Sequence, residues 1–173
     1  MNICSLWRNG THFGWSCISP YEDAELALGY YDEGNTETAD WEIKYMVEHG
    51  IDFQAFCWYA DNSNAPLYHL NNSMHLHDGY LYADYSDAMK YCLIWECANA
   101  ARPQNFDAWK NYYVPYLMEN YFKDSRYMSI DNQLLLAVFG ASKLSEQLGG
   151  ASKVKECFDY LEEEVKKLGY DGM

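Results

Sequence analysis

The first clear pattern along the chain is an amphipathic stretch at residues 38–49. Its apolar side chains fall on one helical face: Ala39, Ile43, Met46 and Val47. Asn35 or Thr36 stands before it as a cap, and Gly50 follows it. The spacing therefore predicts a helix over residues 38–49.

Continuous apolar runs of strand length form the second pattern. They cover residues 51–59, 91–95 and 134–139, and weaker candidates lie at 3–7 and from Tyr170 onward. The first run follows directly on the predicted helix, as a buried parallel strand does. Strands that alternate with helices at this near-regular spacing predict an α/β fold built of parallel βα units.

Such units close either as an open doubly wound sheet or as an eight-fold barrel. No GxGxxG motif follows any of the runs, which disfavours the dinucleotide-binding version of the open sheet. A barrel takes about 250 residues. The 173 residues of the chain therefore predict a partial (β/α)8 TIM-type barrel with about four βα units and a parallel sheet. We expect residues 1–173 to form a single domain, the N-terminal half of a barrel truncated near its C-terminus.

Two more helices are predicted in the second half of the chain. Residues 106–122 have aromatic side chains at helical spacing after Asn105 as a cap, and Pro115 is expected to kink this helix. Residues 154–168 carry an apolar stripe opposite a charged side, and Gly169 ends the helix.

Charge and composition narrow the classes of partner. Acidic residues exceed basic ones to give a net charge of −14, which would repel phosphates and anionic lipid, so neither nucleic acid nor a membrane is an expected partner. The chain shows no export signal and no transmembrane stretch, so a cytoplasmic location is expected if the chain is complete. With 7 Phe, 6 Trp and 17 Tyr, the aromatic content exceeds what a core of this size needs, and many of these rings are expected to line a surface or cleft.

Polar and aromatic residues gather just after the predicted strands, where parallel α/β folds place their sites. Three groups emerge along the chain: Tyr30, Tyr31, Asp32 and Glu33 before the first helix; Trp58, Tyr59, Asp61 and Asn62 after the first run; Trp95, Glu96, Asn99 and Arg102 after the second. Aromatic faces stack on sugar rings, while carboxylates and amides bond to hydroxyl groups. The mixture favours a carbohydrate ligand, with Trp58, Tyr59 and Trp95 as its platform.

Glu96 is the first candidate for chemistry. A partly desolvated carboxylate beside Trp95 has the raised proton affinity that a general acid for glycosidic cleavage needs. The alternative is a structural ion pair with Arg102. A second carboxylate would come from Asp32, Glu33, Asp61 or chain beyond residue 173; yet the first two also suit a helix N-terminus, and Asp61 with Asn62 also suits a turn.

Other chemistries lack their signatures. His75 and His77 form an HxH pair, but the surrounding residues predict a helical or irregular stretch on which the two rings diverge, and His69 is interpreted as a loop residue. The chain holds no HExxH, GxSxG or GxxxxGK[ST] motif. A carboxylate next to Cys97 would raise the pKa of its thiol and not activate it. We expect neither a metal nor a cofactor, and reduced cysteines.

Several segments, in order along the chain, resemble the glycoside hydrolase family 99-like, or glycosyltransferase WbsX, domain. They are residues 28–34, 40–44, 48–52, 56–59, 90–96, 114–116, 120–122 and 126–131, within a match that spans about 12–150. The resemblance implies a (β/α)8 barrel that acts on glycans with a pocket at the carboxyl ends of its strands. It places a site role on Trp95, Glu96 and Asn99, although Cys97 and Ala98 intervene before the Asn, where the family has a closer spacing.

These observations predict a carbohydrate-active domain, most simply a glycoside hydrolase with Glu96 as acid/base or substrate-positioning residue. A non-catalytic glycan-binding fragment is the first alternative. A glycosyltransferase-related protein of cell-surface polysaccharide synthesis is the second, although no phosphate cradle for a nucleotide sugar is visible. Because half a barrel leaves open strand edges, the chain is expected to self-associate or to be part of a longer product.

Overall fold

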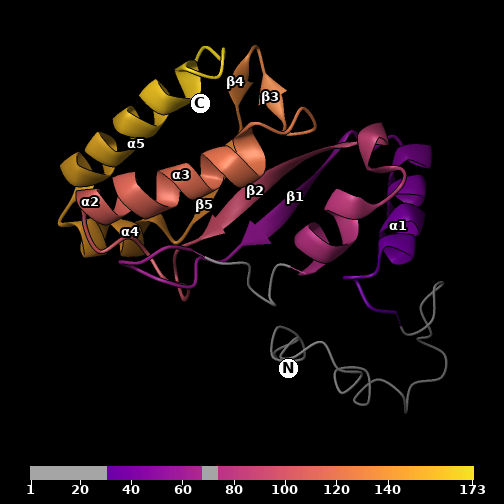
Figure 1. Cartoon of the computed structure of the whole chain (residues 1–173), viewed down its shortest axis with the longest axis horizontal. Coiled ribbons are helices and arrows are strands. Elements are labelled where there is room, and N and C mark those ends of the chain that lie inside the picture. The colour runs from indigo at the N-terminus through magenta and orange to yellow at the C-terminus, as the bar shows by residue number, and fades with distance from the viewer. Residues whose placement is uncertain (1–30, 68–73) are drawn as a thin grey trace. The chain divides into compact units, whose positions relative to one another are not determined.

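The computed structural model of the protein describes residues 31–67 and 74–173, which form two compact units (Figure 1). The first unit holds the described residues 31–50 and 74–88, and the second holds 51–67 and 89–173. The expected strand at 3–7, Tyr30 and His69 lie outside the described residues. The single-domain organisation expected from the sequence stays a prediction.

The first unit is built on helix α1, Thr36–Glu48, which lies within two residues of the predicted bounds at each end. The Asn35 side chain accepts a hydrogen bond from the Glu37 N–H at 2.8 Å and caps the helix, as the sequence indicates. A π-helical turn, His75–Gly79, packs beside α1. Gly79 makes this approach feasible, because a Cβ there would lie 2.5 Å from the Glu33 carbonyl oxygen.

The second unit contains a three-stranded parallel sheet in the order β1-β2-β5. Its strands are β1, Phe53–Trp58; β2, Lys90–Glu96; and β5, Leu136–Phe139. The register pairs Trp58 with Trp95 and Trp95 with Val138, so the carboxyl ends of the three strands share one edge. The α/β class and the parallel pairing expected from the apolar runs are therefore confirmed, in an open sheet.

A short hairpin over residues 129–134 precedes β5 and includes Leu134, the first residue of the strand predicted at 134–139. Tyr127 bridges Tyr91 in parallel, and the chain then leaves the sheet through β3, Ser129–Ile130, and β4, Gln133–Leu134, before it returns as β5. Asp131 and Asn132 form the two-residue turn with φ of 50° and 61°. These residue types tolerate such left-handed backbone, which the tight turn of a hairpin requires.

The rod of residues 106–122 packs on one face of the sheet and crosses it in Figure 1. This rod alternates α2, Phe106–Ala108, and α3, Val114–Leu117, with π-helical turns at Trp109–Tyr113 and Met118–Phe122. Pro115 occupies the first turn of α3, after a π-helical turn, where its missing N–H is tolerated. The irregularity expected near Pro115 therefore takes the form of two π-helical turns, one before and one after α3.

Helices α4, Ala141–Leu148, and α5, Ala151–Lys166, follow β5. The Trp109 ring stacks on Trp95 at 5.3 Å and an angle of 17°, and its indole N–H donates to the Cys157 carbonyl at 2.7 Å. Helix α5 therefore packs beside the rod. The predicted last helix is confirmed, beginning three residues earlier than expected.

The opposite face of the sheet is apolar and much less covered. It carries alternate residues of the strands, among them Phe53, Ala55 and Cys57 of β1, and Ala137 and Phe139 of β5. Phe139 is 59% exposed, whereas Leu93 and Trp95 of β2 are buried. Within residues 31–67 and 74–173, no helix combines the length and apolar composition that a membrane crossing requires.

Candidate functional site

The carboxyl edge of the sheet holds a loop that is built around Glu96. One oxygen of its carboxylate accepts from the N–H groups of Ala98 and Asn99 at 2.7 and 3.1 Å. The other accepts from Asn99 and Ala100 at 3.0 and 2.8 Å. The residue is 7% exposed. A charged carboxylate that binds three consecutive backbone donors fixes the course of residues 97–100.

Both neighbouring strands hold this loop in place. On the β5 side the Cys97 N–H donates to the Phe139 carbonyl at 2.8 Å, and Gly140 approaches so closely that a Cβ would lie 2.7 Å from the Ala98 nitrogen. On the β1 side the Ala101 N–H donates to the Ala60 carbonyl at 3.1 Å. The loop after β2 is therefore tied to the chain that follows β1 and β5.

Arg102 binds the carbonyl groups of the same loop. Its Nη1 donates to the carbonyl oxygens of Cys97, Ala98 and Ala100 at 2.6, 3.3 and 3.1 Å. The Glu96–Arg102 ion pair, expected as the structural alternative, does not form between these two described residues. Glu96 instead binds the N–H groups of the loop, and Arg102 binds its carbonyl groups.

The two tryptophans predicted as a sugar platform belong to the core. Trp58 and Trp95 are 2% and 1% exposed, and their rings pack on one another with centroids 6.0 Å apart. An enclosed indole has no free face to stack on a sugar, which corrects the expected platform. Tyr59 at the end of β1 is half-buried, and so is Tyr116, which stacks on Trp58 at 5.9 Å.

The polar residues predicted after β1 and β2 are more accessible than the tryptophans. Asn62 and Asn99 are exposed, and Asp61 is half-buried. The Tyr113 hydroxyl donates to the Asn62 carbonyl at 2.6 Å, which fastens the chain after β1 to the helical rod. Burial raises the pKa of Tyr113, and the negative charge of Asp61 adds to this shift, whereas the charge of Arg102 opposes it. Asp61 thus acts electrostatically on a phenol of the rod.

Cys97 is not an activated nucleophile. Burial, followed by the charge of Glu96, raises the pKa of its thiol to about 12, whereas Arg102 opposes the shift. The thiol is therefore protonated at neutral pH, as the sequence predicts from the adjoining carboxylate.

The predicted residues before α1 form a separate cluster within the first unit. His75 Nε2 lies 2.7 Å from a Glu42 oxygen, and His75 Nδ1 lies 3.9 Å from a Glu33 oxygen. Burial raises the pKa of Glu33; His75 opposes this shift, and the charges of Glu42 and Asp32 add to it. Tyr31 is hydrogen-bonded to Glu42, and burial, together with that carboxylate, raises its pKa. The result is an imidazole between two glutamates.

Asp32 has a local structural role in this cluster. Its carboxylate accepts from the Gly34 N–H at 2.9 Å, which turns the chain into the cap of α1. Tyr31 also lines a shallow pocket beside the start of α1, together with Asn35, Glu37, Thr38 and Trp41. Within residues 31–67 and 74–173, no set of three His, Cys, Asp or Glu side chains is arranged to hold a metal ion.

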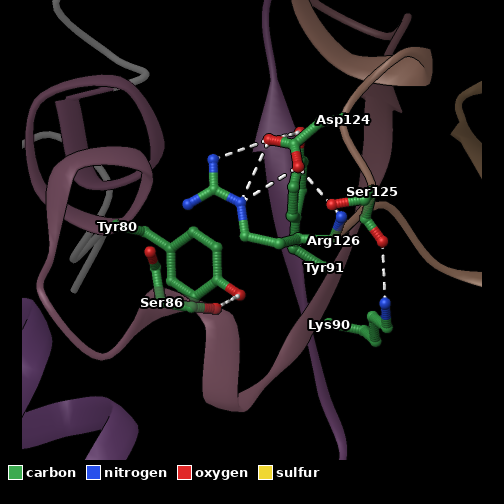
Figure 2. A network of polar contacts seen from close by, with 7 residues as sticks. All are labelled: Tyr80, Ser86, Lys90, Tyr91, Asp124, Ser125 and Arg126. Atoms are coloured by element: carbon green, nitrogen blue, oxygen red, sulfur yellow. Dashed lines mark hydrogen bonds and ion pairs between the residues drawn. The ribbon is translucent and has the colours of Figure 1, made fainter.

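A second polar network lies at the opposite, amino edge of the sheet, as Figure 2 shows. Arg126 donates from Nε and Nη2 to Asp124, the shorter contact being 2.7 Å, and the Tyr91 hydroxyl donates to the same carboxylate at 3.4 Å. Burial alone would raise the pKa of Asp124, but its hydrogen bonds to Arg126 outweigh burial and lower it. This network joins the end of the rod to the start of β2.

Sequence reasoning missed Glu42, His75 as its partner, and the Asp124–Arg126 pair. The Asp-x-Arg spacing before a strand was a local signal for the last of these. Glu42 and His75 are far apart in the chain, and no sequence pattern indicated their contact. No family model, curated protein or solved structure compared with the chain matches it. The resemblance to the family 99-like domain therefore stays a prediction.

Proposed function

We propose that the protein is a carbohydrate-active α/β domain whose ligand binds at the carboxyl edge of β1 and β2. The observation that carries the proposal is the loop 97–100, which Glu96 fixes through the backbone N–H groups. The loop holds the exposed residue Asn99, with its side-chain amide, at the same edge as Tyr59 and Asp61. Amide, carboxylate and phenol groups on fixed supports are the chemistry that recognises a neutral polyol.

We further propose that the second unit is part of a (β/α)8 barrel, as the resemblance to the family 99-like domain implies. This proposal is supported by the order of the strands in the sheet, which is their chain order, and by the helical rod on one face with α5 beside it. The apolar opposite face corresponds to a barrel interior. Gly172 bridges Gln133 in parallel, so the end of the chain begins to pair beside the β3–β4 hairpin.

Glycan binding without hydrolysis is the second candidate, and the surroundings of Glu96 favour it. A general acid must present a proton to the glycosidic oxygen. The Glu96 carboxylate is turned to backbone N–H groups instead. If the protein hydrolyses glycans, a carboxylate other than Glu96 is the simpler candidate for the general acid.

A glycan array followed by an assay for released reducing sugar tests these proposals together. Binding with release of sugar supports a hydrolase, and binding without release supports the binding form. If the protein binds none of the glycans at millimolar concentration, a carbohydrate function is contradicted.

The barrel proposal has its own test, because a partial barrel leaves unpaired strand edges. We expect sedimentation to show concentration-dependent association of the chain with a second copy. A monomer over the whole concentration range contradicts this expectation.

A further inference from the structure

We propose that Asp61 is the carboxylate that contacts the bound saccharide, and that Glu96 is a positioning residue whose role is to build the loop 97–100. The inference rests on the proposed carbohydrate function and reverses the expected importance of the two acids.

The geometry of Glu96 leaves it no capacity for a ligand. A carboxylate offers about four acceptor sites on its two oxygens. Glu96 makes four contacts of 2.7–3.1 Å with the N–H groups of Ala98, Asn99 and Ala100. A sugar hydroxyl would have to displace a backbone donor and leave it unpaired, which costs free energy.

Asp61 differs in both location and surroundings. It stands three residues after Trp58, at the carboxyl end of β1, and is half-buried. Burial raises the pKa of Tyr116, and the charge of Asp61 contributes to that shift as it does for Tyr113. The Tyr113 hydroxyl, which donates to the carbonyl of the adjoining Asn62 at 2.6 Å, brings the rod close to Asp61, and Tyr59, two residues before Asp61, is also half-buried.

The supports of Asp61 are rigid on both sides. The preceding Ala60 accepts from the Ala101 N–H, and the following Asn62 accepts from the Tyr113 hydroxyl. Further along, the Gln104 N–H donates to the Ser63 carbonyl at 2.8 Å. Asp61 is thus held between the loop that Glu96 builds and the helical rod. Such preorganisation lowers the ordering cost of binding.

The test measures the binding of mannohexaose, cellohexaose and xylohexaose by the full chain, using titration calorimetry. We expect Asp61→Asn to weaken the affinity for the best-bound oligosaccharide by about tenfold or more, since a charged hydrogen bond is lost. Asp131→Asn, in the exposed hairpin turn, is the matched control and should bind as the unchanged protein does.

Amide hydrogen exchange without sugar tests Glu96 independently. Glu96→Ala should speed exchange at Ala98, Asn99 and Ala100, and Glu96→Gln, which keeps one oxygen acceptor, should restore part of both the protection and the affinity. Asp61→Asn should leave these three amides protected. Unchanged exchange in Glu96→Ala overturns the positioning role.

The outcomes separate this inference from the proposed function. If the unchanged chain binds none of the three oligosaccharides and no arrayed glycan, the proposed function and the role of Asp61 both fail, while hydrogen exchange still decides the role of Glu96. If the unchanged chain binds and Asp61→Asn binds equally well, only the assignment of Asp61 fails.

Discussion

The two edges of the parallel sheet each hold a carboxylate with several hydrogen bonds, but the donors differ. At the carboxyl edge Glu96 binds only backbone N–H groups of the loop that follows it. At the amino edge Asp124 binds the guanidinium of Arg126 and the hydroxyl of Tyr91. One acid shapes a loop, and the other closes a connection between a helix and a strand.

This difference matches the division of labour in parallel α/β folds. Loops at the carboxyl edge form the sites, whereas the amino edge contributes to stability. A backbone-bound acid leaves the side chains of its loop, such as Asn99, free to vary in chemistry while the loop keeps its shape. A side-chain pair such as Asp124–Arg126 depends on the residue types at both positions, so neither can be replaced without loss of the contact.

The largest effect is expected where the carboxyl-edge loop meets β5. Gly140→Ala should destabilise the protein by about 3 kcal/mol, because the new Cβ would meet the Ala98 backbone and the residue has a left-handed φ of 76°. Gly149→Ala is the matched control: its φ is 91° but nothing lies within 4 Å of the new Cβ. It should cost only about 1 kcal/mol in urea unfolding. Equal losses at both glycines would contradict the close packing of the loop.

A smaller loss is expected from the acid at the same edge. Glu96→Ala leaves three backbone donors without their acceptor and should lower the free energy of unfolding by about 2 kcal/mol. Glu119→Ala, at a side chain that is 70% exposed, should change it by less than about 0.5 kcal/mol. A Glu96→Ala chain as stable as this control would show that the loop does not depend on the carboxylate.

At the amino edge the effect is smaller and depends on pH. Asp124→Asn should cost about 1 kcal/mol at neutral pH, since the pair is less than a fifth exposed. Because the folded-state pKa of Asp124 is lowered, its contribution is present above the unfolded pKa of about 3.9 and is lost as the pH falls further. The stability difference between the two chains should therefore shrink below about pH 4. A difference that persists unchanged in acid would contradict the charged pair.

The smallest effect is expected at the rim of the amino edge. Lys90 is exposed and donates to the Ser125 carbonyl at 2.7 Å, as Figure 2 shows. Lys90→Met should change the free energy of unfolding by less than about 0.5 kcal/mol, because water replaces an exposed donor. A loss as large as that of Asp124→Asn would mean that the rim shares in the network.

Local patterns in the sequence predicted most of the regular elements. The helix before β1, the strands β1 and β2 and the last helix lie close to their predicted residues, because apolar spacing and caps are local properties. The hairpin of residues 129–134 was missed although Asp131-Asn132 is a turn signal, because only residues 134–139 were predicted as a strand and no pairing partner was assigned to residues 129–130. Helix α4, Ala141–Leu148, was also missed: it follows Gly140, which offers no capping side chain.

The sequence predicted that residues after β1 and β2 lie at one edge of the sheet, but not what their side chains contact. Residues after β1 and β2 do gather at one sheet edge, since parallel pairing follows from the strand order. Which rings are exposed depended on tertiary packing: Trp58 and Trp95 were expected at the surface and form the core instead. Whether Glu96 faces a ligand or its own backbone depended on the path of four residues, which no spacing encodes.

The stacked indoles of Trp95 and Trp109 also give the protein an optical signature. Electronic transitions of two aromatic rings so close together couple, and near-ultraviolet circular dichroism detects such fixed aromatic surroundings. One ring belongs to the sheet and the other to the helical rod, so the signal reports whether these two layers remain joined. A spectrum recorded on any variant would therefore separate a disturbed edge loop from a lost core.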